Sequence, residues 1–183
     1  MSGPPAGPDP VWLRTSREHV AGLTGRHRRS VIEYTGEGHK RINGWLRRGG
    51  MPADPWAAAR VRDLDAVLAK NPMQSETVLV RTVDLDAFRL AGGGDLARVV
   101  GVVRVERGYL STTMYADGGR TKAYADPVRL IVRLPAGTPA AAVGELSVAG
   151  QGEVLLGRGL RYVLSDPAYD PGIGMWVVVM EIV

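Results

Sequence analysis

The sequence predicts an α+β protein built around one core, with helices in its first part and strands in the rest. Apolar side chains recur at helical spacing up to Pro72, whereas β-branched and aromatic runs bounded by Gly, Pro or Asp follow it. The length of 183 residues and the 45% hydrophobic content suit one buried core. Because the helices precede the strands instead of alternating with them, the pattern favours α+β over a doubly wound parallel sheet.

The first part predicts a leader followed by helices. Residues 1–10 are almost entirely Gly, Pro, Ala, Ser and Asp, which is typical of a disordered leader or linker, so we expect one domain over residues 11–183. Helical spacing predicts helices over residues 11–24, 40–48 and 54–71. The last of these has Asp54-Pro55 as N-cap and first residue and stops at Asn71-Pro72. The basic cluster at residues 26–29 is typical of a solvated face.

The second part predicts a sheet. Its apolar runs indicate strands over Thr77–Val83, Val99–Val105, Tyr109–Thr113, Val128–Leu134, Arg161–Leu164 and Trp176–Val183. A short helix is expected over Asp84–Leu90, closed by three glycines. A further buried strand runs through Val154-Leu155-Leu156 and is entered through Gln151 and Glu153.

Composition excludes several kinds of site. The chain has no cysteine, which excludes disulfides and thiolate metal sites, and its three histidines form no metal-ligand pattern, so we expect no metal. The net charge of +4 suits an anionic partner without selecting one. No apolar run approaches the ~20 residues that span a bilayer, and no signal peptide is present, so we expect no membrane association.

Three polar motifs stand in or beside the predicted strands: Arg81 in VLVRTV, Ser111-Thr112-Thr113 in GYLSTTM, and Gln151-Gly152-Glu153 in AGQGEVLLGR. Gln151 and Glu153 are two residues apart, so in an extended chain they project from the same face. Each motif also has an ordinary structural interpretation. Arg81 also fits a salt bridge at a strand edge, and the Ser-Thr-Thr hydroxyls also fit hydrogen bonds within a sheet. The Gln-Gly-Glu motif also fits a polar turn before a buried strand.

Taken in order, the motifs resemble those of bacterial ADP-ribosylating toxins of the arginine-serine-glutamate class, over residues 34–183. AGQGEVLLGR is similar to the Ala-Gly-Gln-x-Glu-x-Leu-Leu-Pro-Arg segment of the clostridial exoenzymes that modify Rho GTPases, and YTGEGHKRINGWLR is similar to a helix of theirs. The resemblance implies a mono-ADP-ribosyltransferase with NAD as substrate. It also implies N-terminal helices packed on two small, roughly perpendicular sheets with NAD between them. We expect a monomer that is secreted or delivered into a target cell and acts in its cytosol.

The resemblance implies catalytic roles for Glu153, Gln151 and Ser111. Glu153 would hold the ribose and offset the positive charge that develops as nicotinamide leaves, as carboxylates do in glycosidases. Ser111, on a neighbouring strand, would orient Glu153 through a hydrogen bond. Gln151 would face the acceptor.

The resemblance also implies a set of NAD-binding residues, namely Arg81, Asn43, Arg47, Arg120, Thr112 and Tyr115. Arg81 would grip the pyrophosphate through its planar guanidinium, which is better suited to paired hydrogen bonds than lysine. Asn43 and Arg47, four residues apart, share one helix face, which also fits a surface pair. Arg120 would contact phosphate from its glycine-bearing loop, with Tyr115 or Tyr124 as a stacking ring, although such a loop is also an ordinary hairpin end. Thr112 also fits a role in strand packing.

The acceptor depends on Gln151. In the resembled family, Gln-x-Glu accompanies modification of asparagine in Rho-like GTPases, and an amide can pair with an amide without charge. Relatives with Gln-x-Glu also modify guanine bases, so nucleic acid, either DNA or RNA, stays open. Val148 stands where the Rho-directed enzymes carry an aromatic residue, which weakens a Rho target. A non-catalytic binding module is the third alternative.

Overall fold

Helices α1 (Pro10–Ala21) and α4 (Pro55–Leu68) begin with the same signal, an aspartate N-cap followed by proline. The computed structural model describes residues 7–88, 95–115, 124–148, 150 and 152–183. In it, the Asp9 carboxylate accepts hydrogen bonds from the N–H groups of Val11 (2.6 Å) and Trp12 (3.2 Å). Asp9 and Pro10 therefore belong to a helix start and not to the predicted leader, of which residues 1–6 lie outside the described residues.

Between these helices, one segment differs from the prediction. The basic cluster at residues 26–29 belongs to a helix that was not predicted, α2 (Gly25–Glu33), and the π-turn η1 (Tyr34–Gly38), kinked at Gly36, separates it from α3 (His39–Arg47). Helix α2 buries only Ser30 and Val31, so its apolar periodicity is too weak to stand out in the sequence. Helices α3 and α4 match their predicted ranges closely.

The strands are β1 (Thr77–Asp84), β2 (Arg104–Glu106), β3 (Leu110–Thr113), β4 (Pro127–Leu134), β5 (Ala140–Ala142), β6 (Glu153–Leu156), β7 (Leu160–Asp170) and β8 (Met175–Ile182). The residues described between β1 and β2 include two short 3-10 helices, η2 (Leu85–Phe88) and η3 (Leu96–Val99). Residues 89 and 90 of the short helix that we predicted, with the glycines after it, lie outside the described residues.

The predicted strand over residues 99–105 is mostly wrong. Gly101 has a φ of +73°, which breaks an extended run, and Val102 and Val103 are about half exposed in irregular structure. Only its end enters β2. Strand β5 was not predicted, because three consecutive alanines carry no β-branched signal.

The strands follow one hydrogen-bonded order, β2-β7-β8-β4-β1-β3-β6-β5, and among these described strands only the neighbours β4 and β8 run parallel. We expected two sheets. The order does divide into two groups, because β1 meets β3 through the single pair Val80–Thr113, whereas β1 and β4 pair along eight residues. The predicted α+β fold, with its helices packed against a sheet, is confirmed.

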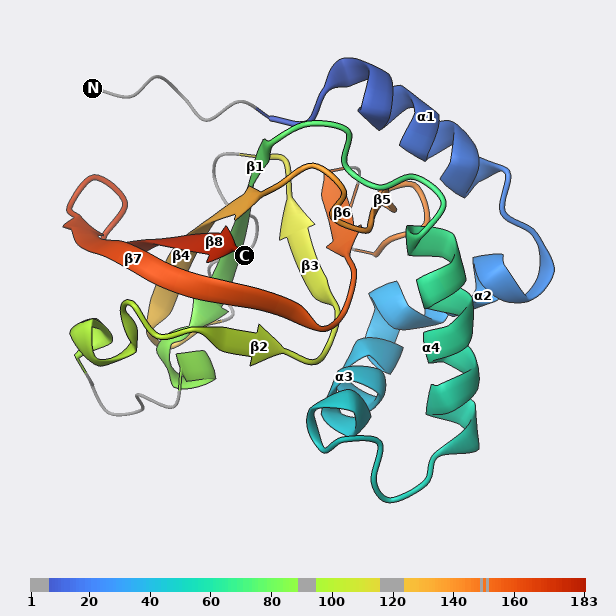
Figure 1. The fold of residues 1–183 in the computed structure, drawn as a ribbon, viewed down its shortest axis with the longest axis horizontal. Helices are drawn as coiled ribbons and strands as arrows, with labels where there is room; N and C mark the ends of the chain where they lie inside the picture. The colour runs from blue at the N-terminus through green and yellow to red at the C-terminus, as the bar shows by residue number, and fades with distance from the viewer. Residues whose placement is uncertain (1–6, 89–94, 116–123, 149, 151) are drawn as a thin grey trace.

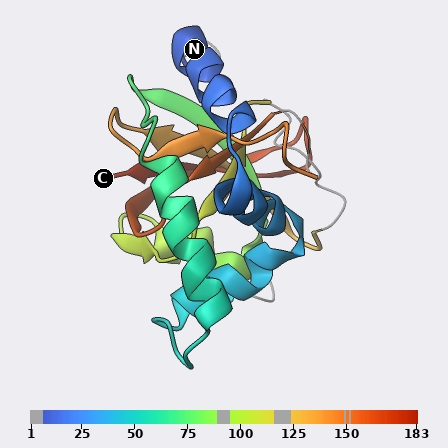
Figure 2. The ribbon, with the colours of Figure 1, turned by 90° about the vertical axis from the view of Figure 1, so that its right-hand side faces the viewer.

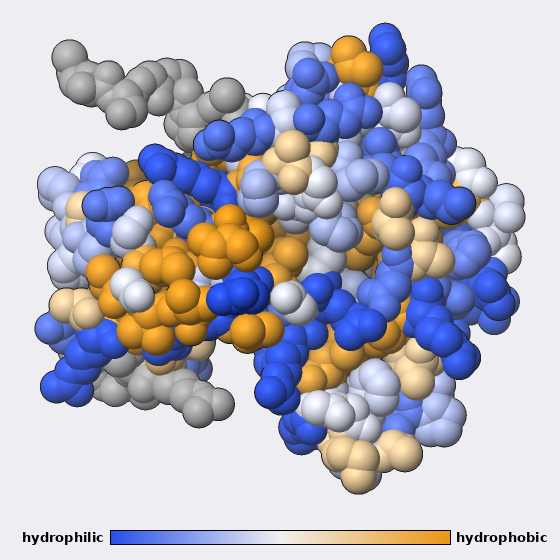
Figure 3. Space-filling view, in the orientation of Figure 1, coloured by the Kyte–Doolittle hydropathy of each residue, from blue (hydrophilic) through white to orange (hydrophobic). Residues whose placement is uncertain are grey.

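Helices α2, α3 and α4 gather beside β3, β6 and β5, and α1 lies over the end of that group (Figure 1, Figure 2). The hydroxyl of Ser16 on α1 accepts a hydrogen bond from the Ala142 N–H (2.9 Å), so α1 covers the outer strand β5. A hydrophobic cluster that includes Ile42, Leu64 and Leu155 joins the helices to β6. Hydrophilic side chains dominate the surface over the helices, whereas hydrophobic ones gather over the β2–β7–β8 part of the sheet (Figure 3).

Strands β1, β3 and β6 are neighbours in the sheet. Each carries one of the three motifs: Arg81 on β1, Ser111 on β3 and Glu153 at the start of β6. Residues separated by as many as 72 positions in the chain are therefore brought together by strand pairing alone.

Candidate active site

Glu153 lies at the point where a loop enters a buried strand. Its N–H donates to the Gly150 carbonyl (3.2 Å) and its own carbonyl accepts from the Val143 N–H (3.0 Å), so the backbone is tied on both sides. The residue is 7% exposed. Among the described residues, the Ser111 hydroxyl donates to its carboxylate Oε1 and the Ser147 hydroxyl donates to Oε2. The predicted contact between Ser111 and Glu153 is therefore present.

Ser147 was not among the predicted site residues. It lies six residues before Glu153 and carries the one hydroxyl among residues 144–152, which is the signal that could have identified it. A loop hydroxyl is a weak sequence signal, because such groups commonly bond their own backbone. Only the fold of the loop brings it to the carboxylate.

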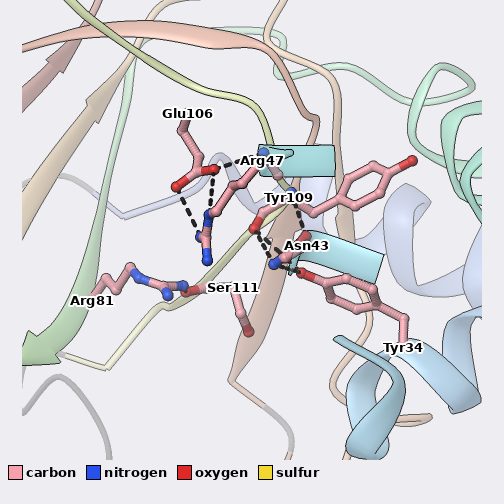
Figure 4. A network of polar contacts seen from close by, with 8 residues as sticks. Tyr34, Asn43, Arg47, Arg81, Glu106, Tyr109 and Ser111 are labelled. Carbon is pink, nitrogen blue, oxygen red and sulfur yellow. Dashed lines mark hydrogen bonds and ion pairs between the residues drawn. The ribbon is translucent and has the colours of Figure 1, made fainter. Parts of the chain in front are cut away.

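Arg81 extends from β1 toward β3. Its Nη1 donates to the Ser111 carbonyl oxygen, so the guanidinium lies beside the serine that bonds Glu153 (Figure 4). Arg81 is partly buried. The structure thus places three predicted residues, Arg81, Ser111 and Glu153, in one connected cluster across three adjacent strands.

Asn43 fixes the backbone that precedes this cluster. Its amide clamps the backbone of Tyr109, with the side-chain Oδ1 accepting from the Tyr109 N–H (3.0 Å) and the Nδ2 donating to the Tyr109 carbonyl (3.1 Å). The Nδ2 also donates to the Tyr34 hydroxyl (3.0 Å). A Cβ on Gly108 would stand 2.8 Å from Asn43 Cγ, so a glycine is required there. Asn43 therefore sets the position of the segment that leads into Ser111.

Arg47 lies on the same helix and forms a bidentate ion pair. Its Nε and Nη2 donate to the two carboxylate oxygens of Glu106 (3.0 and 2.9 Å), as Figure 4 shows. The hydrogen bonds to Glu106 raise the pKa of the Arg47 guanidinium above its ordinary value. Arg47 is thus held at the edge of the cluster by a carboxylate on β2.

Two buried tyrosines support the helical side of the cluster. The rings of Tyr34 and Tyr109 pack edge to face, with their centroids 5.5 Å apart. Burial raises the pKa of Tyr34 to about 12. Burial and the neighbouring Asp65 carboxylate raise the pKa of Tyr109 well above its ordinary value, and its hydroxyl donates to Asp65 Oδ1 (2.7 Å). Both hydroxyls are therefore protonated hydrogen-bond donors at neutral pH.

The remaining predicted residues are placed differently. Thr112 points into the core, is 4% exposed, and donates its hydroxyl to the Val154 carbonyl (2.8 Å), as expected of strand packing. Tyr115 is 54% exposed and its ring lies against Gly152, the residue before Glu153. Gln151 and Arg120 lie outside the described residues.

A cavity of about 430 Å³ lies elsewhere, where β4 and β8 begin, and its lining includes Pro127, Tyr169 and Trp176. None of the predicted site residues is among its described lining residues. Within the described part of the chain, no cluster of three or more His, Asp or Glu side chains could hold a metal ion. No described helix is long and apolar enough to cross a membrane.

A family model described as ADP-ribosyltransferase exoenzyme matches residues 12–167. The chain belongs to this family. ADP-ribosyltransferases use NAD as their substrate. Membership of the family therefore gives this protein the chemistry of NAD-dependent ADP-ribosylation. The resemblance read from the three motifs is thereby confirmed at the level of the family.

Solved structures of bacterial toxins share the fold of this ADP-ribosyltransferase. Plx2a, an ADP-ribosyltransferase toxin from Paenibacillus larvae, is 24% identical with a TM-score of 0.77, covering 94% of each chain. The C3 exoenzyme of Clostridium limosum is 22% identical with a TM-score of 0.75, covering 100% of this chain and 98% of its own. C3stau2 from S. aureus, solved with NAD, is 22% identical with a TM-score of 0.76, covering 97% of both. A search of curated protein sequences found no match.

Proposed function

We propose that this ADP-ribosyltransferase cleaves NAD and transfers ADP-ribose to an asparagine side chain of a target protein, for which a Rho-like GTPase is one candidate. One observation carries the proposal. The carboxylate of Glu153 is oriented by hydroxyls on both oxygens, and the guanidinium of Arg81 on β1 is hydrogen-bonded to the carbonyl of Ser111 on the intervening strand β3. A fixed carboxylate next to a cationic group suits a substrate that develops positive charge at one end and carries phosphates at the other.

The proposed reaction starts with cleavage of the bond between ribose C1′ and the nicotinamide nitrogen. Both bonding electrons leave with nicotinamide, which becomes neutral, and the ribose carries the positive charge as an oxocarbenium ion. Glu153 stabilises this charge. The acceptor amide nitrogen then bonds to C1′ and loses one proton to water. Where water takes the place of the acceptor, the products are ADP-ribose and a proton, which accounts for an NAD glycohydrolase side activity.

The binding roles follow the geometry. Arg81 is proposed to bind the pyrophosphate, since a guanidinium offers paired donors to phosphate oxygens. Arg47 on α3 is proposed to bind the pyrophosphate together with Arg81. The phosphates would then compete with the Glu106 carboxylate for the Arg47 guanidinium. Asn43 is proposed to act indirectly, because its amide is engaged with Tyr109 and Tyr34.

The acceptor proposal rests on residue type. Gln151 supplies an amide that pairs with an amide acceptor without a charge, as the Gln-x-Glu resemblance implies. Val148, at 75% exposed, presents an apolar side chain on the loop that leads into Glu153 and suits contact with a protein surface. We also propose that the protein is secreted or delivered into a target cell and acts in its cytosol.

Nucleic acid is the second candidate acceptor. The net charge of +4 favours polyanion binding, and Arg26, Arg28 and Arg29 are exposed on α2. A base acceptor predicts binding that weakens steeply with salt, whereas a protein acceptor does not require it.

The test is nicotinamide release from NAD by the wild type, by Glu153→Gln and by Glu145→Gln, with circular dichroism to compare their folds. Glu145 is an exposed carboxylate on the same loop and is the matched control. We expect Glu153→Gln to lower kcat by about a hundredfold or more and Glu145→Gln to leave it unchanged. Labelled NAD in cell lysate, followed by protease, nuclease and mass spectrometry, then identifies the acceptor. A folded wild type that neither binds nor cleaves NAD would contradict the proposal and favour a non-catalytic binding module.

A further inference from the structure

The loop between β5 and β6 reaches the Glu153 carboxylate through Ser147. Turns shape this loop, since the Leu146 N–H donates to the Val143 carbonyl (2.8 Å) and the Ser147 N–H to the Gly144 carbonyl (3.4 Å). The Thr35 hydroxyl in η1 donates to the Leu146 carbonyl (3.2 Å). Two local turns and one hydrogen bond from η1 therefore hold the loop with the Ser147 hydroxyl directed at Glu153 Oε2.

The two serine contacts constrain different motions of the carboxylate. A single hydroxyl donor on one oxygen leaves the carboxylate free to swing about that oxygen. A second donor on the other oxygen, coming from a separate segment of chain, sets the plane of the group as well. At 7% exposure, water has little access to replace a lost donor. Each carboxylate oxygen accepts about two hydrogen bonds, so the serine contacts leave acceptor capacity for a ribose hydroxyl.

We infer that Ser147 is a second positioning residue for the reaction, acting with Ser111 to hold Glu153 in the orientation that stabilises the ribose cation. The inference rests on the proposed function of Glu153. It also links the loop that carries Gln151 to the catalytic carboxylate, so a displacement of this loop disturbs NAD cleavage even without an acceptor. Removal of the hydroxyl is expected to act on the chemical step more than on NAD binding, because it removes a hydrogen bond made directly to the Glu153 carboxylate.

The experiment compares Ser147→Ala, Ser147→Thr and Thr35→Val in steady-state nicotinamide release, with thermal unfolding of each variant. Ser147→Thr keeps a hydroxyl at the same position. Thr35→Val removes a hydroxyl that supports the same loop through Leu146 but does not contact Glu153, so it reports loosening of the loop alone. We expect Ser147→Ala to lower kcat by about tenfold with KM for NAD within twofold, and we expect Ser147→Thr and Thr35→Val to retain most of the wild-type kcat.

Two results would overturn the inference while leaving the proposed function intact. One is an active wild type whose kcat is unchanged in Ser147→Ala. The other is an equal loss of kcat in all three variants, together with equal losses of thermal stability, which assigns Ser147 a purely structural role. A wild type without NAD cleavage would instead contradict the proposed function, so the two failures are distinguishable.

Discussion

The ring of Tyr115 lies directly against Gly152, in the space that a side chain on residue 152 would occupy. A Cβ on Gly152 would stand 2.3 Å from Tyr115 Cε2 and 2.6 Å from Cδ2. Tyr115 follows the Ser-Thr-Thr strand and Gly152 precedes Glu153, so this contact joins the second and third motifs. The residue between Gln151 and Glu153 is therefore determined by packing as well as by chain flexibility.

Gly152→Ala tests this contact. The added methyl group must displace the Tyr115 ring, which is 54% exposed and can move outward, so we expect little loss of stability but a displaced stacking surface. If Tyr115 stacks on NAD, Gly152→Ala raises KM for NAD by about tenfold, or about 1.4 kcal/mol, which lies within the about 1–3 kcal/mol of a base stacked on an aromatic ring. Steady-state kinetics of Gly152→Ala, Tyr115→Ala and the double variant measure this. We expect the double variant to raise KM for NAD no more than the stronger single variant does. If the two increases in the free energy of binding add instead, the two residues act separately.

Arg81→Lys tests the pyrophosphate role. Lysine keeps the charge but loses the planar fork, so we expect KM for NAD to rise by about tenfold with a smaller change in kcat. Arg133→Lys is the control, because Arg133 lies on β4 and pairs with Glu181 (3.2 Å) at an exposed site. Titration calorimetry with NAD checks the affinity directly. Unchanged affinity for NAD in Arg81→Lys would contradict the pyrophosphate role and leave Arg81 with a structural role, its bond to the Ser111 carbonyl.

The buried tyrosines predict loss of stability in alkali. In the unfolded chain a tyrosine loses its proton near pH 10, whereas burial raises the pKa of Tyr34 to about 12. Between these values the folded state holds more protons, so the stabilisation is complete below pH 10 and declines as pH rises toward 12. Each such tyrosine lowers the free energy of unfolding by about 1.4 kcal/mol per pH unit in this window.

Urea unfolding of the wild type and of Tyr34→Phe between pH 9 and 12 measures this slope. Phenylalanine has no proton to lose, so we expect the variant to decline less steeply by the contribution of one group. The remaining slope comes from Tyr109 and Tyr162, whose pKa values burial also raises. Equal slopes in the two proteins would show that Tyr34 ionises without unfolding.

Much of the fold was predictable, and the failures have identifiable causes. Asp54-Pro55 marked the start of α4 because capping chemistry is local to a few residues. The run at residues 99–105 misled, since β-branched residues favour a strand only where a partner strand is available to pair with. Strand β5 escaped prediction because its three alanines pair with β6 and are covered by α1, both of which are tertiary effects.

The candidate site divides in the same way. Arg81, Ser111 and Glu153 were identified because the types and order of these residues resemble the motifs of ADP-ribosylating toxins, and the structure brings the three together. Asn43 was assigned to NAD, yet its amide is used to clamp Tyr109. An amide has the same hydrogen-bonding groups in either role, and its sequence position does not tell them apart.

The sequence by itself determined the family, the order of helices and strands, and the three residues that we propose carry the chemistry, because these depend on local patterns and on residue type. Only the tertiary structure decided which groups meet. It directed the Ser147 hydroxyl to the free side of the Glu153 carboxylate, paired Arg47 with Glu106, and placed Tyr115 on Gly152. Such contacts join segments that are far apart in the chain or folded back by a loop, and they depend on strand pairing and loop geometry that no short stretch of sequence encodes.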